Sequence, residues 1–133
     1  MKLYSFIFAA LPILSLIFIG ASCSTASRIT SVSSADFGER ITAQGTQLVD
    51  VRTPGEYAEG HIAGAVNIDV NSSDFLSAAS AALSKEQPVY VYCRGGVRSK
   101  KAAKKLAKKG YTVIDLDNGI LGWQSDGNPV VTD

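Results

Sequence analysis

The stretch PVYVYCRGGVRS, residues 88–99, decides the fold class of this chain. Its first five residues are β-branched or aromatic apart from the leading proline, and such residues favour a strand. Cys93 ends the strand, and Gly95 and Gly96 permit a tight loop directly after it. The pattern that follows predicts a helix over about residues 99–109. Strand, loop and helix in this order make one β–α unit, in which active loops lie at the carboxyl ends of the strands.

The residues after Cys93 suit it to nucleophilic chemistry. Glycines let the backbone turn its N–H groups inward, and the start of the helix adds unpaired N–H donors. A thiolate is stabilised at the centre of such a ring, and the same ring can bind an anionic substrate. A buried structural cysteine is the alternative, but it would not call for two arginines and two glycines within five positions. We therefore predict Cys93 as the catalytic residue and Arg94, Gly95, Gly96, Val97 and Arg98 as the substrate-binding loop.

Strands and helices alternate on both sides of this unit. Further strands are expected at about residues 29–32, 48–51, 65–68 and 112–116, with helices at about 34–43, 54–59, 72–83 and 119–124. Thr53, Pro54 and Glu56 form a capping box with proline at the first helical position, which fixes one helix start. The alternation predicts an α/β fold with a mostly parallel sheet flanked by helices.

Composition limits the chain to one domain of ordinary globular type. It has 133 residues, of which 46% are apolar, and a net charge of +1. After residue 23 there are 12 basic and 12 acidic side chains, so the domain is near neutral. This balance argues against nucleic acid as a partner.

The N-terminus has the pattern of an export signal. Lys2 precedes an apolar run over residues 3–21, and the run ends in Gly20-Ala21-Ser22-Cys23. Small residues before a cysteine resemble the signal of bacterial lipoproteins, in which that cysteine is acylated. We expect a signal peptide at 1–22, a lipid-anchored tether at 23–32, and a location in the cell envelope facing the periplasm. Simple secretion and an uncleaved N-terminal membrane anchor are the alternatives.

Only two cysteines are present, Cys23 and Cys93. If Cys23 carries lipid, Cys93 is the one thiol of the mature protein, and no internal disulfide can form.

Three motifs together resemble the rhodanese family and cover about residues 30–131. The first is LVDVR at 48–52 followed by EY at 56–57 and GHIAGAVNI at 60–68. The second is YVYC at 90–93 with the loop to Arg98 and Ser99, and the third is the closing segment over 116–130. The resemblance implies a rhodanese domain at 33–133 with a five-stranded sheet.

The resemblance also implies sulfur transfer through a persulfide on Cys93. The donor would be thiosulfate or a persulfide, and the acceptor would be cyanide or a thiol, including a thiol on another protein. No cofactor or metal is implied. A non-catalytic module that binds an anion or a partner is one alternative, and a phosphatase or arsenate reductase of the same fold is another. Four residues separate Cys93 from Arg98, whereas the related phosphatases have five, and the shorter ring suits a sulfur atom.

Other polar residues near these motifs are expected to support the structure. Asp50 and Arg52 lie at a strand end, and we predict a salt link between them that braces the site. His61 precedes the next strand, where the resemblance favours a structural role over a general base. Gly95 stands where many relatives have serine and Asn118 where many have glycine, a position at which asparagine tolerates a left-handed backbone.

Six lysines follow the active loop, at positions 100, 101, 104, 105, 108 and 109. They form stripes on one side of the predicted helix, with alanines and Leu106 on the other. They make either a solvated helix face or a basic surface that gathers anionic donors or contacts anionic lipid.

Overall fold

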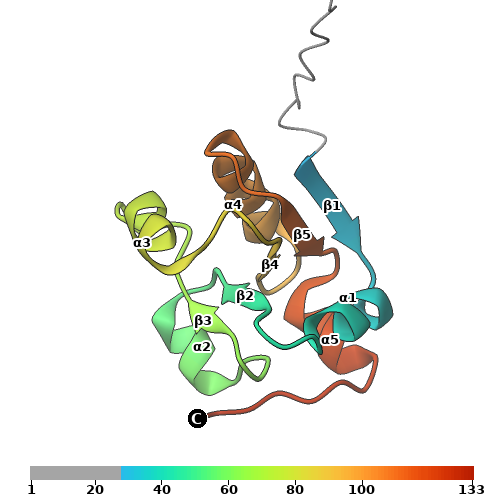
Figure 1. Cartoon of the computed structure of the whole chain (residues 1–133). Coiled ribbons are helices and arrows are strands. Elements are labelled where there is room, and N and C mark those ends of the chain that lie inside the picture. The colour runs from blue at the N-terminus through green and yellow to red at the C-terminus, as the bar shows by residue number, and fades with distance from the viewer. Residues whose placement is uncertain (1–27) are drawn as a thin grey trace, which may run out of the picture.

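The computed structural model describes residues 28–133, which form a layered α/β domain (Figure 1). The predicted signal peptide at 1–22, Cys23 and residues 24–27 of the tether lie outside the described residues. Within 28–133, no helix has both the length and the apolar character needed to cross a membrane.

Five parallel strands form one sheet in the order β1-β5-β4-β2-β3. The strands are β1 (Ile29–Val32), β2 (Gln47–Asp50), β3 (Val66–Asn67), β4 (Val89–Tyr92) and β5 (Val113–Leu116). Residues 29–32, which the sequence predicts as a strand at the end of the tether, form the edge strand β1 beside β5. The α/β fold class and the five-stranded parallel sheet expected from the sequence are confirmed.

Helices cover both faces of the sheet. They are α1 (Ser34–Ile41), α2 (Pro54–Glu59), α3 (Phe75–Ala82), α4 (Val97–Lys108) and α5 (Gly119–Ser125). Buried side chains of α3 and α4 pack on one face, and those of α1 and α5 pack on the other. The central strand β4 is therefore enclosed on both faces by apolar layers, as a parallel sheet requires.

Side chains of β4 alternate between these two layers. Val89 and Val91 belong to the core under α3 and α4, whereas Tyr92 belongs to the core under α1 and α5. Cys93 continues the alternation and lies in the same layer as the two valines. The period of two along the strand thus aims Cys93 toward the start of α4.

Helices α1, α2 and α5 begin at the predicted residues, whereas α3 begins at Phe75, three residues later than predicted, and α4 begins earlier. Ser33 caps α1, and Thr53 with Glu56 forms the predicted capping box of α2. Helix α4 begins at Val97, two residues earlier than expected, because Gly96 adopts φ +107° and turns the chain into the helix at once. The earlier start places Arg98 and Ser99 in the first turn, among the amides that have no partner within a helix.

Candidate active site

Cys93 is enclosed by the loop that follows it. The Gly96 amide donates to the Cys93 Sγ at 3.1 Å, and the Ser99 hydroxyl oxygen lies 3.5 Å from the same sulfur. The Ser99 hydroxyl in turn donates to the Gly96 carbonyl at 3.1 Å. Cys93 is only 1% exposed, so the surrounding backbone and Ser99 determine the environment of its sulfur.

Glycine is required at position 96 for two reasons. Its φ of +107° lies in the region that side chains rarely adopt. A Cβ at this position would also lie 2.2 Å from the Asp117 carbonyl oxygen. The loop therefore closes around the sulfur only because residue 96 has no side chain.

The start of α5 fixes the outer side of the same loop. The amides of Ile120 and Leu121 donate to the carbonyls of Cys93 and Arg94, at 2.9 and 3.1 Å. Gly119 permits this contact, since a Cβ there would lie 2.3 Å from the Arg94 oxygen. These two hydrogen bonds hold the backbone of the loop in the conformation in which the Gly96 amide points toward the sulfur.

Arg98 is held by a carboxylate of α2. Its two terminal nitrogens donate to the two Glu56 carboxylate oxygens at 2.6 and 2.9 Å. Hydrogen bonds from Arg98 lower the pKa of Glu56 to about 2, and the same bonds raise the pKa of Arg98. The guanidinium is therefore oriented before any substrate arrives, and its remaining N–H groups stay available for an anion.

Lys100 ties the loop to β5. Its Nζ contacts the Asp115 carboxylate at 3.2 Å, the Asp117 carboxylate at 3.0 Å and the Gly96 carbonyl at 3.5 Å. Burial lowers the pKa of Lys100, but the hydrogen bonds that its ammonium donates to these two carboxylates outweigh that effect and leave the pKa raised. Since Asp115 is fully buried in the sheet, this contact connects the active loop to the core.

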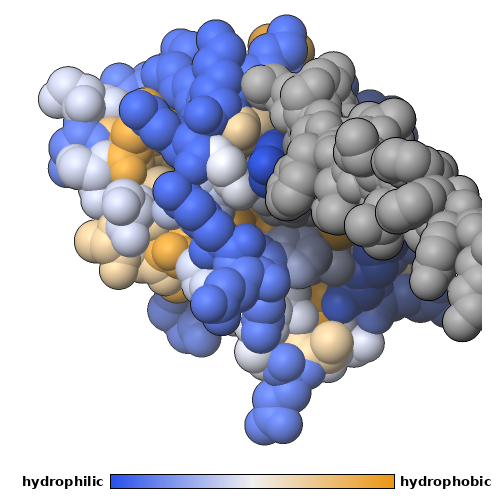
Figure 2. Space-filling view, turned by 45° about the horizontal axis from the view of Figure 1, so that its top comes forward, coloured by the Kyte–Doolittle hydropathy of each residue, from blue (hydrophilic) through white to orange (hydrophobic). Residues whose placement is uncertain are grey.

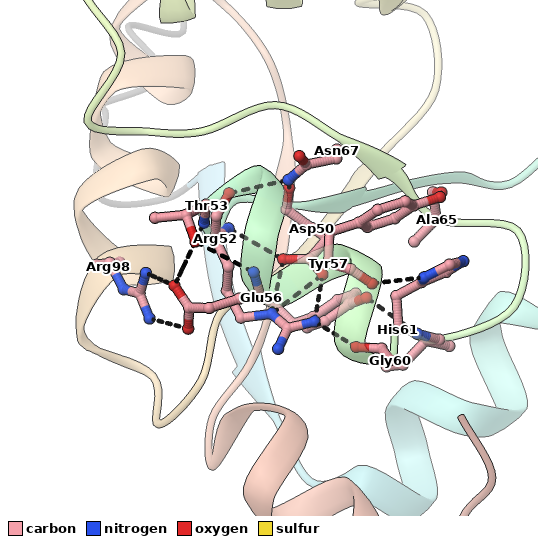
Figure 3. A network of polar contacts seen from close by, with 12 residues as sticks. Asp50, Arg52, Thr53, Glu56, Tyr57, Gly60, His61, Ala65, Asn67 and Arg98 are labelled. Atoms are coloured by element: carbon pink, nitrogen blue, oxygen red, sulfur yellow. Dashed lines mark hydrogen bonds and ion pairs between the residues drawn. The ribbon is translucent and has the colours of Figure 1, made fainter. Parts of the chain in front are cut away.

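Asp50 and Arg52 form a closed network at the end of β2 (Figure 3). The Arg52 guanidinium donates to both Asp50 carboxylate oxygens, at distances from 2.7 to 3.1 Å, and to the Gly60 carbonyl at 2.7 Å. Asn67 donates to the backbone carbonyls of Asp50 and Arg52. Asp50 is 0% and Arg52 6% exposed, so this ion pair is part of the structure beneath the surface.

His61 is engaged in structural contacts. Its Nδ1 lies 2.9 Å from the Tyr57 carbonyl oxygen, and its Nε2 lies 2.9 Å from a carboxylate oxygen of Asp133. The His61 ring stacks on the Tyr57 ring with centroids 3.7 Å apart, and the His61 backbone bridges to Val131. These contacts agree with the structural role expected for this histidine.

The predicted loop residues differ in their distance from the sulfur. Gly96 is buried against the sulfur, whereas Arg94, Gly95 and Val97 are exposed on the outer side of the loop. Asn118 has φ −93°, so the left-handed position expected for it belongs to Gly119 instead. No group of three or more potential metal ligands occurs within residues 28–133.

Four residues of this arrangement were not assigned to the site from the sequence: Glu56, Ser99, Lys100 and Asp115. Glu56 was explained by its capping box, and only the folded chain shows that its carboxylate also faces Arg98. For Ser99 the sequence held a usable signal, because this residue ends the loop motif that follows Cys93.

Comparison with known proteins gives the family. The sequence profile of the family described as "Rhodanese-like domain" matches residues 33–126, so the chain belongs to the rhodanese-like family. Among characterised relatives, a "Sulfurtransferase" of Allochromatium vinosum is 31% identical over 105 residues, covering 77% of this chain and 95% of that protein. The "Thiosulfate sulfurtransferase GlpE" of Pseudomonas fluorescens is 37% identical over 92 residues, covering 68% of this chain and 81% of that protein.

A solved structure supports the same assignment. The rhodanese-related protein of Thermoplasma volcanium is 34% identical, with a TM-score of 0.69 over 78% of this chain and 99% of that one. Family, relatives and fold together support a role of the sulfurtransferase type.

Proposed function

We propose that this protein moves a sulfane sulfur from thiosulfate or a persulfide donor to a thiophilic acceptor, with Cys93 as the carrier. The observation that carries the proposal is the 3.1 Å hydrogen bond from the Gly96 amide to the Cys93 sulfur. An amide aimed at a sulfur stabilises negative charge there, both on a thiolate and on a persulfide. Arg98, oriented by Glu56, keeps its remaining N–H groups available to the anionic donor.

The reaction proceeds in two displacements. The Cys93 thiolate attacks the outer sulfur of thiosulfate, and a bond forms between the two sulfurs. The sulfur–sulfur bond of thiosulfate breaks, and sulfite leaves with the electron pair of that bond. In the second step cyanide attacks the outer persulfide sulfur, the bond to Cys93 breaks, thiocyanate leaves, and the electron pair of the broken bond restores the Cys93 thiolate. A thiolate acceptor becomes a persulfide in the same way. Neither step calls for a metal or an organic cofactor.

Intact mass of the purified protein tests this proposal. The mass should rise by one sulfur atom after thiosulfate is added and return to its first value after cyanide is added. Cys93→Ser should show neither change while keeping the unfolding midpoint of the wild type. If the wild-type protein gains no sulfur from any sulfane donor, the non-catalytic binding module becomes the better explanation.

Hydrolysis of aryl phosphates separates the proposal from the phosphatase alternative. Four residues between Cys93 and Arg98 leave a small ring, and Gly96 closes it over the sulfur. We expect negligible phosphatase activity from the wild-type protein. Efficient hydrolysis of phosphate esters without any use of thiosulfate would contradict the proposed function.

We also propose that the protein is lipidated at Cys23 and held in the cell envelope, facing the periplasm. The sequence Gly20-Ala21-Ser22-Cys23 at the end of an apolar run supports this location. Cys23→Ser should accumulate as an unprocessed precursor, whereas the wild type should be smaller and extracted only by detergent. Wild-type protein found entirely in the soluble periplasmic fraction or the medium would exclude the lipid anchor.

A further inference from the structure

Positive charge is concentrated on one segment of a domain whose total charge is balanced. Residues 87–114 contain eight basic and no acidic side chains, although the chain after residue 23 has 12 of each. Six of the eight lie within α4, whose sequence is VRSKKAAKKLAK. Lysines three and four positions apart on a helix repel one another, so a helix that only needed solubility would alternate them with glutamates.

Four of these side chains have no acidic partner, and we call them the lysine row: Lys101, Lys104, Lys105 and Lys108. No carboxylate of residues 28–133 lies within 4.0 Å of any of them. The Lys101 Nζ contacts the Asn71 side-chain oxygen, and the Lys105 Nζ lies 5.9 Å from the centre of the Phe75 ring. Lys100 differs from the row, because Asp115 and Asp117 neutralise it.

The lysine row lines a groove that begins at the active loop. The groove has a volume of about 590 Å³, and its lining runs from Gly95, Gly96 and Val97 through Lys100 to the lysine row. Figure 2, in which the upper end of Figure 1 is turned forward, shows hydrophilic side chains gathered over this part of the molecule. Val97 lies at the end of the groove next to the active loop. Its side chain is apolar, and 84% of its surface is exposed.

The size of the groove points to a polymeric ligand. From Val97 to Lys108 the helix rises about 16 Å, which an extended segment of about five residues would span. A thiosulfate ion needs only the few donors beside Cys93, so it does not account for charges one to three turns further along. The ligand must carry several negative charges along an extended backbone.

We propose that the groove binds an acidic segment of a protein whose thiol is the sulfur acceptor. This proposal rests on the proposed function. It adds the class of the acceptor, which is an acidic protein with a cysteine next to its negatively charged segment. The acidic segment pairs with the lysine row, and the cysteine beside it reaches Cys93 past Val97. An anionic membrane could contact the same lysines, but it would bring no thiol to the loop at which the groove begins.

Sulfur transfer at this site is a single displacement. The Cys93 persulfide formed from thiosulfate first takes up one proton from water, and the acceptor thiolate then attacks its outer sulfur. A new sulfur–sulfur bond forms on the acceptor, the bond to Cys93 breaks, and its electron pair leaves with Cys93 as a thiolate. The acceptor departs as a protonated persulfide, so no further oxidant or reductant is needed.

Binding of a labelled peptide tests the groove without any need for sulfur transfer. The probe is an eight-residue peptide of glutamate and aspartate without cysteine, and its control is a glutamine peptide of equal length. With the full chain in neutral detergent, we expect the acidic peptide to bind at least ~10-fold more tightly at low salt. Most of this preference should disappear at about 0.5 M salt, where charges are screened beyond a few ångströms.

Two double variants with equal loss of charge locate the binding. Lys104→Gln/Lys108→Gln removes half of the lysine row and should weaken binding of the acidic peptide about 5-fold. Lys85→Gln/Lys109→Gln removes two lysines that line a different pocket and should leave binding unchanged. Equal effects of the two double variants, or no preference for the acidic peptide, would overturn the proposal.

The same peptides with one cysteine added test the acceptor role. From protein loaded with thiosulfate, the acidic peptide should take the sulfur faster than the neutral one, and Lys104→Gln/Lys108→Gln should abolish this difference. The rate with cyanide should be equal in both double variants. If cyanide accepts sulfur but the two peptides react alike, the acceptor proposal is wrong and the proposed function stands. Failure to form the persulfide would instead reject the proposed function.

Amine labelling separates a protein partner from a membrane. We expect the acidic peptide to protect Lys104 and Lys108 of the full chain from an amine-reactive reagent. If vesicles rich in anionic phospholipid protect these lysines, while neutral vesicles and the acidic peptide do not, the lysine row contacts lipid and the proposal is overturned.

Discussion

The loops that follow β2 and β4 begin side by side and differ in how their polar groups are used. Asp50 at the end of β2 pairs in register with Tyr92 at the end of β4. After β2, Arg52 and Asp50 neutralise each other in a buried network. After β4, the Gly96 amide is directed at a single sulfur, and three neighbouring loop residues remain exposed.

This difference gives the loop after β2 a structural role and the loop after β4 a catalytic one. Charges that are fully paired beneath the surface can hold a loop in place but have no capacity left for a substrate. An amide aimed at one buried sulfur has that capacity, because it stabilises the negative charge that the sulfur carries during the reaction. Substitutions after β2 should therefore affect stability first, and substitutions after β4 should affect sulfur transfer first.

Loss of Asp50 should have the largest effect. Asp50→Ala leaves the Arg52 guanidinium buried without its counterion, which should lower the free energy of unfolding by about 3–5 kcal/mol. Urea unfolding measures the change. The matched control is Asp36→Ala, because Asp36 and Arg40 form a similar ion pair at 2.9 Å whose side chains are about 40% exposed. The control should lower the free energy of unfolding by less than about 1 kcal/mol. An equal loss in both variants would show that burial does not determine how much such a pair stabilises the fold.

Gly119→Ala should come next and should affect both stability and sulfur transfer. Its φ is +63°, and the new Cβ would lie 2.3 Å from the Arg94 oxygen, so the loop after β4 must move. We expect a loss of about 3 kcal/mol in the free energy of unfolding and at least a tenfold loss of sulfur transfer. Gly127→Ala is the control, since Gly127 has φ +86° with nothing within 4 Å. It should cost about 1 kcal/mol and leave the rate unchanged, and a similar rate in both variants would contradict our account of the loop.

Arg98→Lys should reduce the use of thiosulfate while the fold stays intact. An ammonium cannot hold Glu56 and an oxyanion in the planar, multidentate way of a guanidinium. We expect kcat/KM for thiosulfate to fall by an amount equivalent to about 1–3 kcal/mol, the range of a charge-assisted hydrogen bond. Arg40→Lys makes the same substitution in an exposed ion pair, and it should change neither kcat/KM for thiosulfate nor the fold. An unchanged kcat/KM in Arg98→Lys would exclude Arg98 from donor binding.

The smallest effect concerns pH and Glu56. Arg98 lowers the pKa of Glu56 to about 2 in the folded chain, from about 4.5. The stability from this pair is therefore present above about pH 4.5 and is lost as the pH falls through about 2. For a partly exposed pair we expect a contribution of about 1 kcal/mol or less. Urea midpoints at pH 6 and pH 3 should differ less in Glu56→Gln than in the wild type, whereas Glu59→Gln on the same helix should keep the wild-type difference.

Local signals allowed most of the fold to be predicted from the sequence. The alternation of β-rich runs with capped helices gave the α/β class, and the residues 88–99 located the central strand and its loop. Ser33 and the Thr53 capping box are local interactions, so their helix starts could be predicted closely. The start of α4 was less accurate, because Gly96 provides no side-chain cap and depends on its contact with Asp117.

Contacts between distant segments could not be predicted in the same way. Glu56 and Arg98 are 42 positions apart, and Lys100 on α4 is 15 positions from its partner Asp115 on β5. Neither pair can be recognised from a fixed separation in the sequence, because that separation depends on the order of the strands in the sheet. The same holds for Gly119, whose approach to Arg94 exists only after α5 has folded against the active loop.

The parallel order of the strands also fixes the direction in which the cysteine faces. The described chain enters the sheet at Ile29, the amino end of β1, whereas Cys93 follows the carboxyl end of β4. All five strands point the same way, so the entry and the sulfur lie at opposite edges, about 13 Å of strand apart. A protein attached through Ile29 therefore keeps the buried Cys93 at the opposite edge of the sheet, away from the point of attachment.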